Sequence, residues 1–419
     1  MNKSLYIVAF SLAFATTGIA QNNEGQDKTV DLGTQTTTEL RKTQAVSTIY
    51  SDELDKNATT SPYNAIYGLL PGLTVMQNTS WGTDKSRLNV RGRGSLNGDT
   101  PLFVVDGFAR PIEYINLSEI ESISVLKDGA ATALWGGRGA NGVVLITTKR
   151  GMYSKKEIKV DYKFGLGLPV NQPEFADAYT YAKARNEALR YDGLQPDMDE
   201  ASFLAGGNSD LYPNVDWQKE ALRNHTTSHQ LDITFRGGGK RLRYFSVLNY
   251  KNDMGLLNSK YTDYTDRYNS QMKKYFLNLR MNLDVDITDA TKLKLNMLGM
   301  LRETKRPTTS EATLFEQIFN TPSAAFPVQT QNGLWGSNNV LKTNPIANLA
   351  DVGYYKLNQR MLQADLRLIQ DLSVLTRGLS AELAIAYDNN ATYQETAKKS
   401  FMYQTIEKGT DGEPEIGRA

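Results

Sequence analysis

The segment Gly137–Gly142 reads Gly-Arg-Gly-Ala-Asn-Gly, which matches the spacing of a dinucleotide-binding fingerprint. That fingerprint needs a strand before it and a helix after it, so that the pyrophosphate meets a helix N-terminus. In this chain an Ala-rich helical segment comes first, and the apolar run Val143–Ile146 follows as a strand. The reversed order argues against nucleotide binding. It favours a tight helix-to-strand turn, where glycine accepts positive φ.

Two further pairs have the spacing of chemical sites. His225 and His229 are four residues apart, as in a helical metal pair, but the chain has no cysteine and no third histidine. A histidine pair in a loop or at a rim is therefore favoured. Asp284 and Asp286 share one strand face with other polar residues, which favours a solvated wall over a general acid and base.

Three arginines, Arg91, Arg93 and Arg110, could bind an anion. In a packed domain, however, arginine more often pairs with carboxylates or carbonyls, and we favour that role. With no thiol and only two histidines, the sequence predicts a protein that is not an enzyme and uses no metal or cofactor.

The chain has 419 residues, with 47 Lys and Arg against 46 Asp and Glu, so its formal net charge is +1. This balance gives no reason to expect nucleic acid as a partner. The length allows two or three domains with a large core. The 22 tyrosines suit surfaces that are apolar at one end and wet at the other.

Residues 1–20 have the pattern of a secretory signal peptide. Met1–Lys3 is a short positive start, Leu5–Ala15 is apolar, and Gly18–Ala20 forms a small-residue cleavage site. The apolar run is shorter than the ~18 residues that a membrane-spanning helix needs. Residues 21–60 are polar and predict a flexible leader.

Residues 61–151 predict a compact α/β domain. Strands are expected at Leu73–Met76, Ser86–Arg93, Leu102–Val105, Ile123–Leu126 and Val143–Ile146, with a helical turn at Tyr63–Leu70. A short helix before the last strand is expected to begin at Asp128 as its N-cap and to stop at Gly136 and Gly137.

Residues 152–419 change to a period of two, which predicts β-strands with one apolar and one polar face. We expect seven strands between 157 and 388, several of them longer than the ~5–6 residues usual in globular sheets. Such lengths suit tilted transmembrane strands. A tight turn at 288–290 contrasts with long insertions at 168–226, which includes a predicted helix at 176–189, and at 302–356. Short turns on one rim and long loops on the other are typical of outer-membrane barrels, although a soluble β-sandwich shares the alternation.

These motifs together resemble one family, the SusC/RagA-type TonB-linked outer-membrane transporters. The resemblance is carried by Pro71–Val75, Arg91–Leu96, Pro101–Gly107 and Ile120–Gly151, in the order and spacing of the family's plug domain. It implies an α/β plug followed by the first strands of an antiparallel transmembrane barrel of about 22 strands. The plug-motif positions are Arg91, Gly92, Arg93, Gly94, Asp106, Gly107, Lys127, Asp128, Gly136, Arg138, Gly139, Asn141 and Gly142.

The resemblance also implies a function and partners. The protein would reside in the outer membrane, in contact with its lipid, and import an oligosaccharide or, less expected, a peptide, with the plug as gate. TonB would supply the energy, and a SusD-like surface lipoprotein would cap the barrel. Thr29, Val30, Asp31 and Leu32 form the candidate TonB box, which TonB would add as a strand to its own sheet. Trp335, Tyr354 and Tyr355 are candidate ligand-contacting aromatics.

The chain departs from the family pattern in two ways. The additional N-terminal domain often found before the plug is missing, and about seven strands cannot close a barrel around a plug. We therefore expect a fragment or a truncated gene product with an incomplete barrel at 152–419. The alternatives are an exported β-rich adhesin or binding module, or a non-functional truncated transporter.

Overall fold

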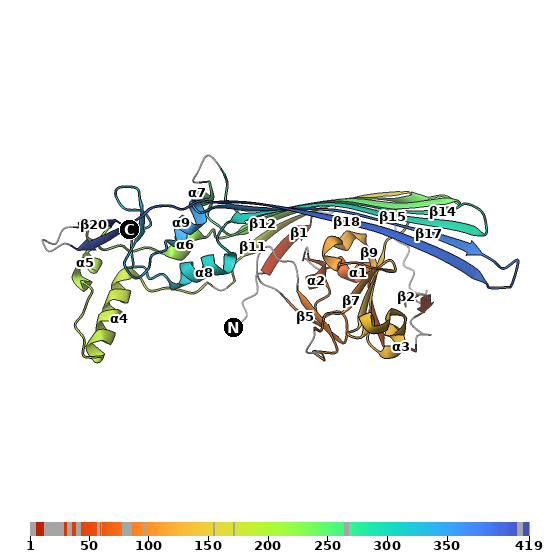
Figure 1. Ribbon diagram of the computed structural model, residues 1–419, viewed down its shortest axis with the longest axis horizontal. Coiled ribbons are helices and arrows are strands. Elements are labelled where there is room, and N and C mark those ends of the chain that lie inside the picture. Colours follow the sequence, from red (N-terminus) through yellow and green to blue (C-terminus); the bar gives the residue numbers. More distant parts are fainter. Residues whose placement is uncertain are drawn as a thin grey trace.

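The computed structural model describes residues 6–11, 29–31, 36–38, 43–56, 59, 61–77, 86–94, 98–153, 156–170, 172–263, 268–408 and 414–418. A small α/β domain lies against one face of a long antiparallel sheet, and a cluster of helices extends from one end of that sheet (Figure 1). We call these parts the small domain, the strand wall and the loop cluster. No helix among the described residues is long and apolar enough to cross a lipid bilayer.

The small domain is built on a five-stranded mixed sheet. Its order is β4 (Val46–Tyr50), β9 (Ile120–Leu126), β10 (Val143–Thr148), β7 (Leu102–Val105) and β8 (Phe108–Ala109), with only the β10–β7 pair parallel. A separate hairpin joins β5 (Leu73–Met76) to β6 (Arg87–Val90). The strands predicted at Leu73–Met76 and Leu102–Val105 are confirmed with the same bounds.

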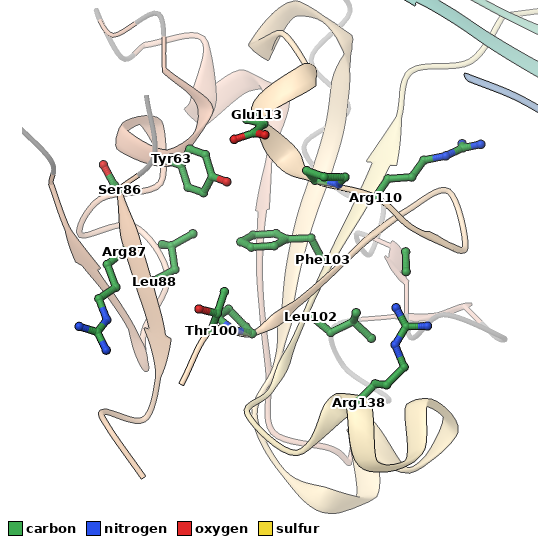
Figure 2. Close-up of a pocket in the computed structure, with 13 residues that line it drawn as sticks. Tyr63, Ser86, Arg87, Leu88, Thr100, Leu102, Phe103, Arg110, Glu113 and Arg138 are labelled. Atoms are coloured by element: carbon green, nitrogen blue, oxygen red, sulfur yellow. The ribbon is translucent and has the colours of Figure 1, made fainter. Parts of the chain in front are cut away.

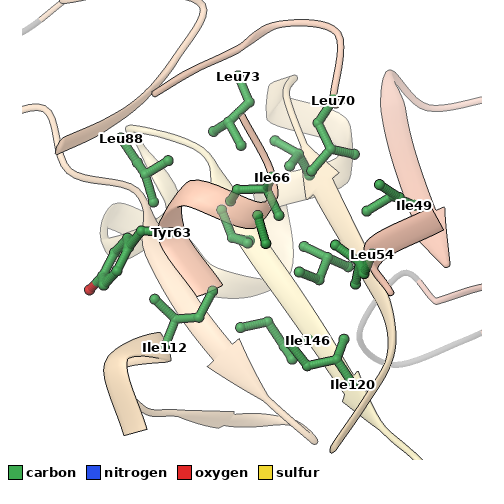
Figure 3. Packing of buried hydrophobic residues seen from close by; sticks show 14 of the residues in the cluster. Ile49, Leu54, Tyr63, Ile66, Leu70, Leu73, Leu88, Ile112, Ile120 and Ile146 are labelled. Carbon is green, nitrogen blue, oxygen red and sulfur yellow. The ribbon is translucent and has the colours of Figure 1, made fainter. Parts of the chain in front are cut away.

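Short helices complete the small domain and close its main hydrophobic core. They are α1 (Ser51–Leu54), α2 (Pro62–Ala65), α3 (Gly129–Thr132) and the 3-10 turns η1 (Ile112–Tyr114), η2 (Leu117–Glu119) and η3 (Ala133–Gly139). Ile66 after α2, Leu54 of α1 and the sheet residues Ile120 and Ile146 are buried in one cluster (Figure 3). The strands read as continuous apolar runs because both faces of this sheet are covered.

The expected leader at 21–60 contributes to this domain, so its predicted boundary is too late. β4 and α1 lie before residue 61, and their side chains Ile49 and Leu54 are fully buried in the core. The sequence concealed this because polar residues separate the few apolar ones in this stretch. Within the expected signal peptide, β1 (Tyr6–Ser11) pairs antiparallel with a strand of the wall; removal of residues 1–20 stays a prediction.

The strand wall contains the seven long strands expected from the alternation. They are β11 (Glu157–Leu168), β12 (Thr226–Gly238), β13 (Leu242–Met254), β14 (Lys273–Asp286), β15 (Thr291–Pro307), β17 (Gly353–Asp371) and β18 (Ser380–Lys398). Within the described residues the sheet order is β1-β11-β12-β13-β14-β15-β17-β18, each neighbour antiparallel. The two longest strands have 19 residues each.

The two faces of the wall differ as the period of two predicted. Ile158, Leu279 and Ile385 project from the outer face and are exposed. Asn278, Arg280 and other polar residues of the same strands point the opposite way, toward the small domain. A continuous apolar outer face is what a membrane-spanning strand presents to lipid.

The loop cluster is more ordered than a set of polar loops. It contains α4 (Ala178–Tyr191), close to the predicted helix, together with α5 (Glu200–Ala205), α6 (Trp217–Ala221), α7 (Ser259–Thr262), α8 (Glu311–Asn320), α9 (Pro345–Ala350) and the short strands β16 (Trp335–Ser337), β19 (Tyr403–Lys408) and β20 (Pro414–Arg418). Helices α6, α8 and α9 enclose a second apolar core that includes Trp217, Leu314 and Ile346. At the opposite end of the wall, residues 287–290 make the predicted tight turn.

Candidate functional site at the contact of the small domain with the strand wall

A buried ion pair joins the small domain to the middle of the wall. Glu119, at the end of η2, is 0% exposed, and its Oε2 accepts a hydrogen bond of 2.6 Å from Nε of Arg280 on β14. Asn278, two residues earlier on β14, donates to the other carboxylate oxygen at 2.5 Å. A carboxylate out of water is stable only when it is paired and hydrogen-bonded, so these two wall residues hold Glu119 in place.

A second ion pair lies further along the sheet. Arg110, after β8, donates from Nη1 to Asp365 of β17 at 2.5 Å and from Nη2 to Asp388 of β18 at 2.8 Å. These carboxylates hold the pKa of the Arg110 guanidinium above its usual range, in spite of burial. The sequence favoured pairing with carboxylates over anion binding for this residue, and the structure confirms the pairing.

The Asp106-Gly107 turn between β7 and β8 is the third attachment. The Asp106 carboxylate accepts hydrogen bonds from the backbone N–H of Thr148 at 3.0 Å and from its hydroxyl at 2.6 Å, which ties β7 to β10. Arg367 of β17 donates to the Asp106 carbonyl at 2.9 Å. Gly107 has φ +90°, and a Cβ there would lie 2.6 Å from Nη2 of Arg367. The glycine therefore leaves room for a wall arginine.

Amide and hydroxyl groups fill the contact between these ion pairs. Asp232 of β12 accepts from Asn116 of the small domain at 3.3 Å and from Asn249 of β13 at 2.8 Å. Asn249 also donates to the Ser118 hydroxyl at 2.8 Å. Asn282 of β14 donates to Thr148 and to the Lys149 carbonyl. The small domain is thus seated on the wall mainly by polar groups, with one small apolar cluster around Tyr114, Phe276 and Met361.

The arginines of β6 and of the turn after it pair within the small domain. Arg93 and Arg87 both pair with Asp99, at 3.1 Å and 2.8 Å. The Arg87 hydrogen bond, assisted by the charge of Arg93, holds the pKa of Asp99 below its usual range. Arg91 and Gly92 adopt positive φ, and the Arg91 N–H donates to the Gly72 carbonyl; Gly94 follows in the same turn. These motif residues shape the hairpin.

The remaining motif residues have structural contacts within the small domain. Asp128 is the N-cap of α3, as predicted: its Oδ1 accepts from the Ala131 N–H at 2.8 Å and its Oδ2 from the Ala45 N–H at 2.9 Å. These backbone hydrogen bonds hold the Asp128 pKa below its usual range. Lys127 donates to Ser47 at 2.6 Å. The helical segment ends differently from the prediction, because α3 continues into η3, with Gly136 at φ 54° inside it.

The glycines before β10 make the turn that the sequence indicated. A Cβ at Gly142 would lie 2.8 Å from the Val90 side chain, and one at Gly139 would lie 3.1 Å from the Thr132 carbonyl. Gly142 also has φ +89°. Asn141 donates to the Gly98 carbonyl at 3.1 Å. Close packing and positive φ, not phosphate binding, account for this glycine spacing.

Arg138 lines a pocket of about 580 Å3 between the β5–β6 hairpin and β7. Figure 2 shows Phe103 in its middle, with Arg87 on one side and Arg138 and Arg110 on the other. Within the described residues no group of three His, Cys, Asp or Glu side chains could hold a metal ion. The pocket is thus lined by three arginines around an aromatic side chain.

The candidate aromatics separate into three environments. Trp335 is 4% exposed in the core of the loop cluster, so its ring has almost no surface for a ligand. Tyr354 lies on the outer face of β17 and hydrogen-bonds Glu395. Tyr355 faces inward, with the Arg306 guanidinium 4.1 Å from its ring centroid. Of the three, only Tyr355 stands on the inner face that holds the small domain.

The candidate TonB box lies in a strand where it is described. Thr29–Asp31 form β2 and pair with β3 (Thr36–Thr38), while Leu32 lies outside the described residues. Val30 is fully buried against an apolar cluster that includes Val46, Leu126 and Leu145. A role for these residues in binding TonB stays a prediction.

Sequence reasoning missed most residues of the contact. Glu119 and Arg280 are 161 positions apart, and Arg110 and Asp388 are 278 apart. The available signal was the set of charged and amide residues at alternating positions on β14 and β17, which marked the inner face but not its partners.

The comparisons with known proteins agree with this geometry. Residues 38–143 match the TonB-dependent Receptor Plug Domain. The chain is 30% identical over 255 residues to the TonB-dependent receptor SusC of Bacteroides thetaiotaomicron, which covers 57% of this chain and 24% of SusC. It is 28% identical over 281 residues to a TonB-dependent receptor of Formosa agariphila, covering 65% of this chain and 26% of that receptor. The matches thus span about a quarter of the length of these curated relatives.

Solved structures show the same fold. The RagAB peptide importer in its 'open-open' state superposes with a TM-score of 0.71 at 20% identity, covering 88% of this chain and 43% of that chain. Its 'closed-closed' state gives a TM-score of 0.68 at 19% identity, covering 85% of this chain and 42% of that chain.

The fold and the matches define a plug domain followed by strands of an outer-membrane barrel. The chain is of the TonB-dependent receptor type, of the SusC/RagA kind, and covers the plug and part of the barrel. This is a family of transporters, not enzymes, and its location is the outer membrane. The small domain is hereafter called the plug.

Proposed function

We propose that this protein serves TonB-dependent import across the outer membrane, with the plug as a gate seated on the barrel wall. The observation that carries the proposal is the polar seating of the plug, through Glu119–Arg280 and Arg110–Asp365. Hydrogen bonds and ion pairs exchange readily with water when a contact opens, whereas a large apolar interface would not. A polar seat therefore suits a domain that must move and return.

The proposed substrate and partners are based on the similar proteins. SusC is a curated relative at 30% identity, and RagAB, at 19% identity, is named as a peptide importer. We propose an oligosaccharide as cargo, with a peptide as the alternative, and a SusD-like lipoprotein as the surface partner. TonB would pull on Thr29–Leu32. The described part of this segment, Thr29–Asp31, forms β2, and an extended strand suits addition to another sheet.

An engineered crosslink tests the gate, and this chain suits the method because it has no cysteine of its own. Ser118 of the plug and Asn249 of the wall are in hydrogen-bonding contact at 2.8 Å. In the full-length protein, Ser118→Cys with Asn249→Cys should abolish TonB-dependent uptake when oxidised and restore it after reduction. The matched control is Thr288→Cys with Thr291→Cys, whose hydroxyls are 2.9 Å apart in a wall turn.

Three results would count against the gate, the transporter or the proposed cargo. Full uptake by the oxidised Ser118–Asn249 variant would contradict a gate at this contact. Recovery of the full-length protein in the soluble secreted fraction would favour the adhesin or binding module instead. Uptake of a labelled peptide mixture without uptake of oligosaccharides would reverse the proposed cargo.

A further inference from the structure

A row of lysines crosses the outer face of the wall near the loop cluster. Lys273 of β14 lies directly opposite Lys305 of β15, and Lys305 lies opposite Lys356 of β17. All three project outward, because their neighbours in the alternation contact the plug: Lys274 and Phe276 border a small cavity with Pro62, and Arg302 donates to the Glu113 carbonyl.

This row begins where the apolar outer face ends. Leu277, Leu301 and Leu362 lie on the same face, nearer the tight turns, and are exposed. The lysines stand within a few residues of the strand ends that lead into α7, α8 and α9. In outer-membrane barrels the long loops are extracellular, so the row lies at the level of the outer leaflet's headgroups.

The charges of the row are only partly compensated. Glu303 is shared by two ammonium groups, 3.1 Å from Lys305 and 3.2 Å from Lys356. Glu395 lies opposite Lys356 and hydrogen-bonds Tyr354. Arg360, two outward positions from Lys356, is exposed. Four cations against two carboxylates leave a net charge of +2 on this face.

Like charges directly opposite each other destabilise a strand pair. Glu303 already lies between Lys305 and Lys356, so the opposition that remains is that of Lys273 and Lys305. It costs stability unless a further anion lies between their ammonium groups. We propose that this row binds the phosphate groups of an anionic lipid of the outer leaflet, whose acyl chains lie along Leu277, Leu301 and Leu362. The inference rests on the proposed location of these strands in the outer membrane.

The position favours a lipid phosphate over a free one. A free phosphate would gain only the partly exposed ammonium groups, whose attraction is weak and screened by salt. A lipid adds apolar contact along the same face, and each basic residue near a membrane surface contributes about fivefold in affinity. Lysines and leucines lie next to each other on one face, so the same surface can bind both the phosphate and the acyl chains of a lipid.

The test uses the full-length protein in detergent, with phosphorylated lipid A as the probe and native mass spectrometry as the readout. The triple variant Lys273→Gln, Lys305→Gln, Lys356→Gln should bind the probe on the order of 100-fold more weakly. Lys240→Gln, an exposed lysine at the opposite rim, is the matched control and should bind like the unaltered protein.

Three outcomes would overturn the inference: equal binding by the triple variant, equal binding of dephosphorylated lipid A, or displacement of the probe by inorganic phosphate at the probe's own concentration. Membrane fractionation distinguishes a failure of the lipid-binding inference from a failure of the proposed import function. If the unaltered protein is absent from the outer membrane, the import proposal fails; if it is present but binds without phosphate dependence, only the lipid inference fails.

Discussion

The plug and the strand wall place their apolar residues differently. The plug buries them in its core, and the wall exposes them on its outer face. In the plug, short strands such as β9 are covered on both faces, and Leu126 is 0% exposed. In the wall, long strands carry their leucines outward, and Leu279 is 46% exposed. One part is a conventional globular core, and the other keeps its polar side for the plug and presents its apolar side to lipid.

Because the wall turns its polar face to the plug, the two parts are in contact without sharing one hydrophobic core. The wall residues that contact the plug are mainly arginines, aspartates and asparagines. They hydrogen-bond with Glu119, Arg110 and Asp106 of the plug. Polar contacts fix orientation but contribute modestly to net stability. The plug core and the contact with the wall are therefore held by different kinds of interaction.

The largest effect is expected when a charge is removed from the contact between plug and wall. Arg280→Ala leaves Glu119 buried without its ionic partner, which should cost about 3 to 5 kcal/mol of docking free energy. Native-state proteolysis of the full-length protein should then show plug cleavage accelerated by ~100-fold or more.

The double variant Arg280→Leu with Glu119→Leu is the control, because it removes both charges together. It should recover most of the loss, since replacing a buried ion pair by apolar residues is often nearly neutral. Equal destabilisation by the single and double variants would mean that side-chain volume, not charge, holds the plug.

The same Leu→Ala substitution should have different effects in the plug and in the wall. Leu126→Ala removes packing from the plug core and should destabilise it by about 2 to 5 kcal/mol. Leu279→Ala lies on the outer face of the wall and should leave cleavage of the plug unchanged. An equal effect of the two substitutions on plug cleavage would show that wall and plug share one cooperative core.

The parts that the sequence predicted well are those governed by local pattern. The alternation at Leu277–Ile287 defined a long strand and its two faces, and Asp128 before an Ala-rich segment indicated a cap. The residues paired between plug and wall are 116 to 278 positions apart, and no local pattern pairs Glu119 with Arg280. Trp335 seemed a rim aromatic because the apolar residues that bury it, such as Trp217 and Ile346, are scattered through separate insertions.

A smaller effect is expected at the cap of α3. Asp128→Ala removes two backbone hydrogen bonds, from Ala131 and Ala45, and should destabilise the plug by about 1 to 2 kcal/mol. Asp177→Ala removes the equivalent cap of α4 in the loop cluster. Proteolysis should respond in the plug to the first change only; a plug that opens more in the Asp177 variant would contradict the separation of the two parts.

The smallest expected effect is a pH dependence at the ion pairs of Asp99 with Arg87 and Arg93 in the plug. Hydrogen bonds from Arg87 and Arg93 lower the pKa of Asp99, so the folded plug binds fewer protons there than the unfolded chain. Its contribution to stability is complete above the ordinary aspartate pKa of about 4 and is lost as the pH falls through the lowered value. Because both arginine side chains are largely exposed, solvent screening keeps the contribution small. Pepsin cleavage of the plug between pH 5 and pH 2 should therefore rise less steeply in Asp99→Asn than in the unaltered protein, and parallel slopes would show that the hairpin ion pairs do not stabilise the plug.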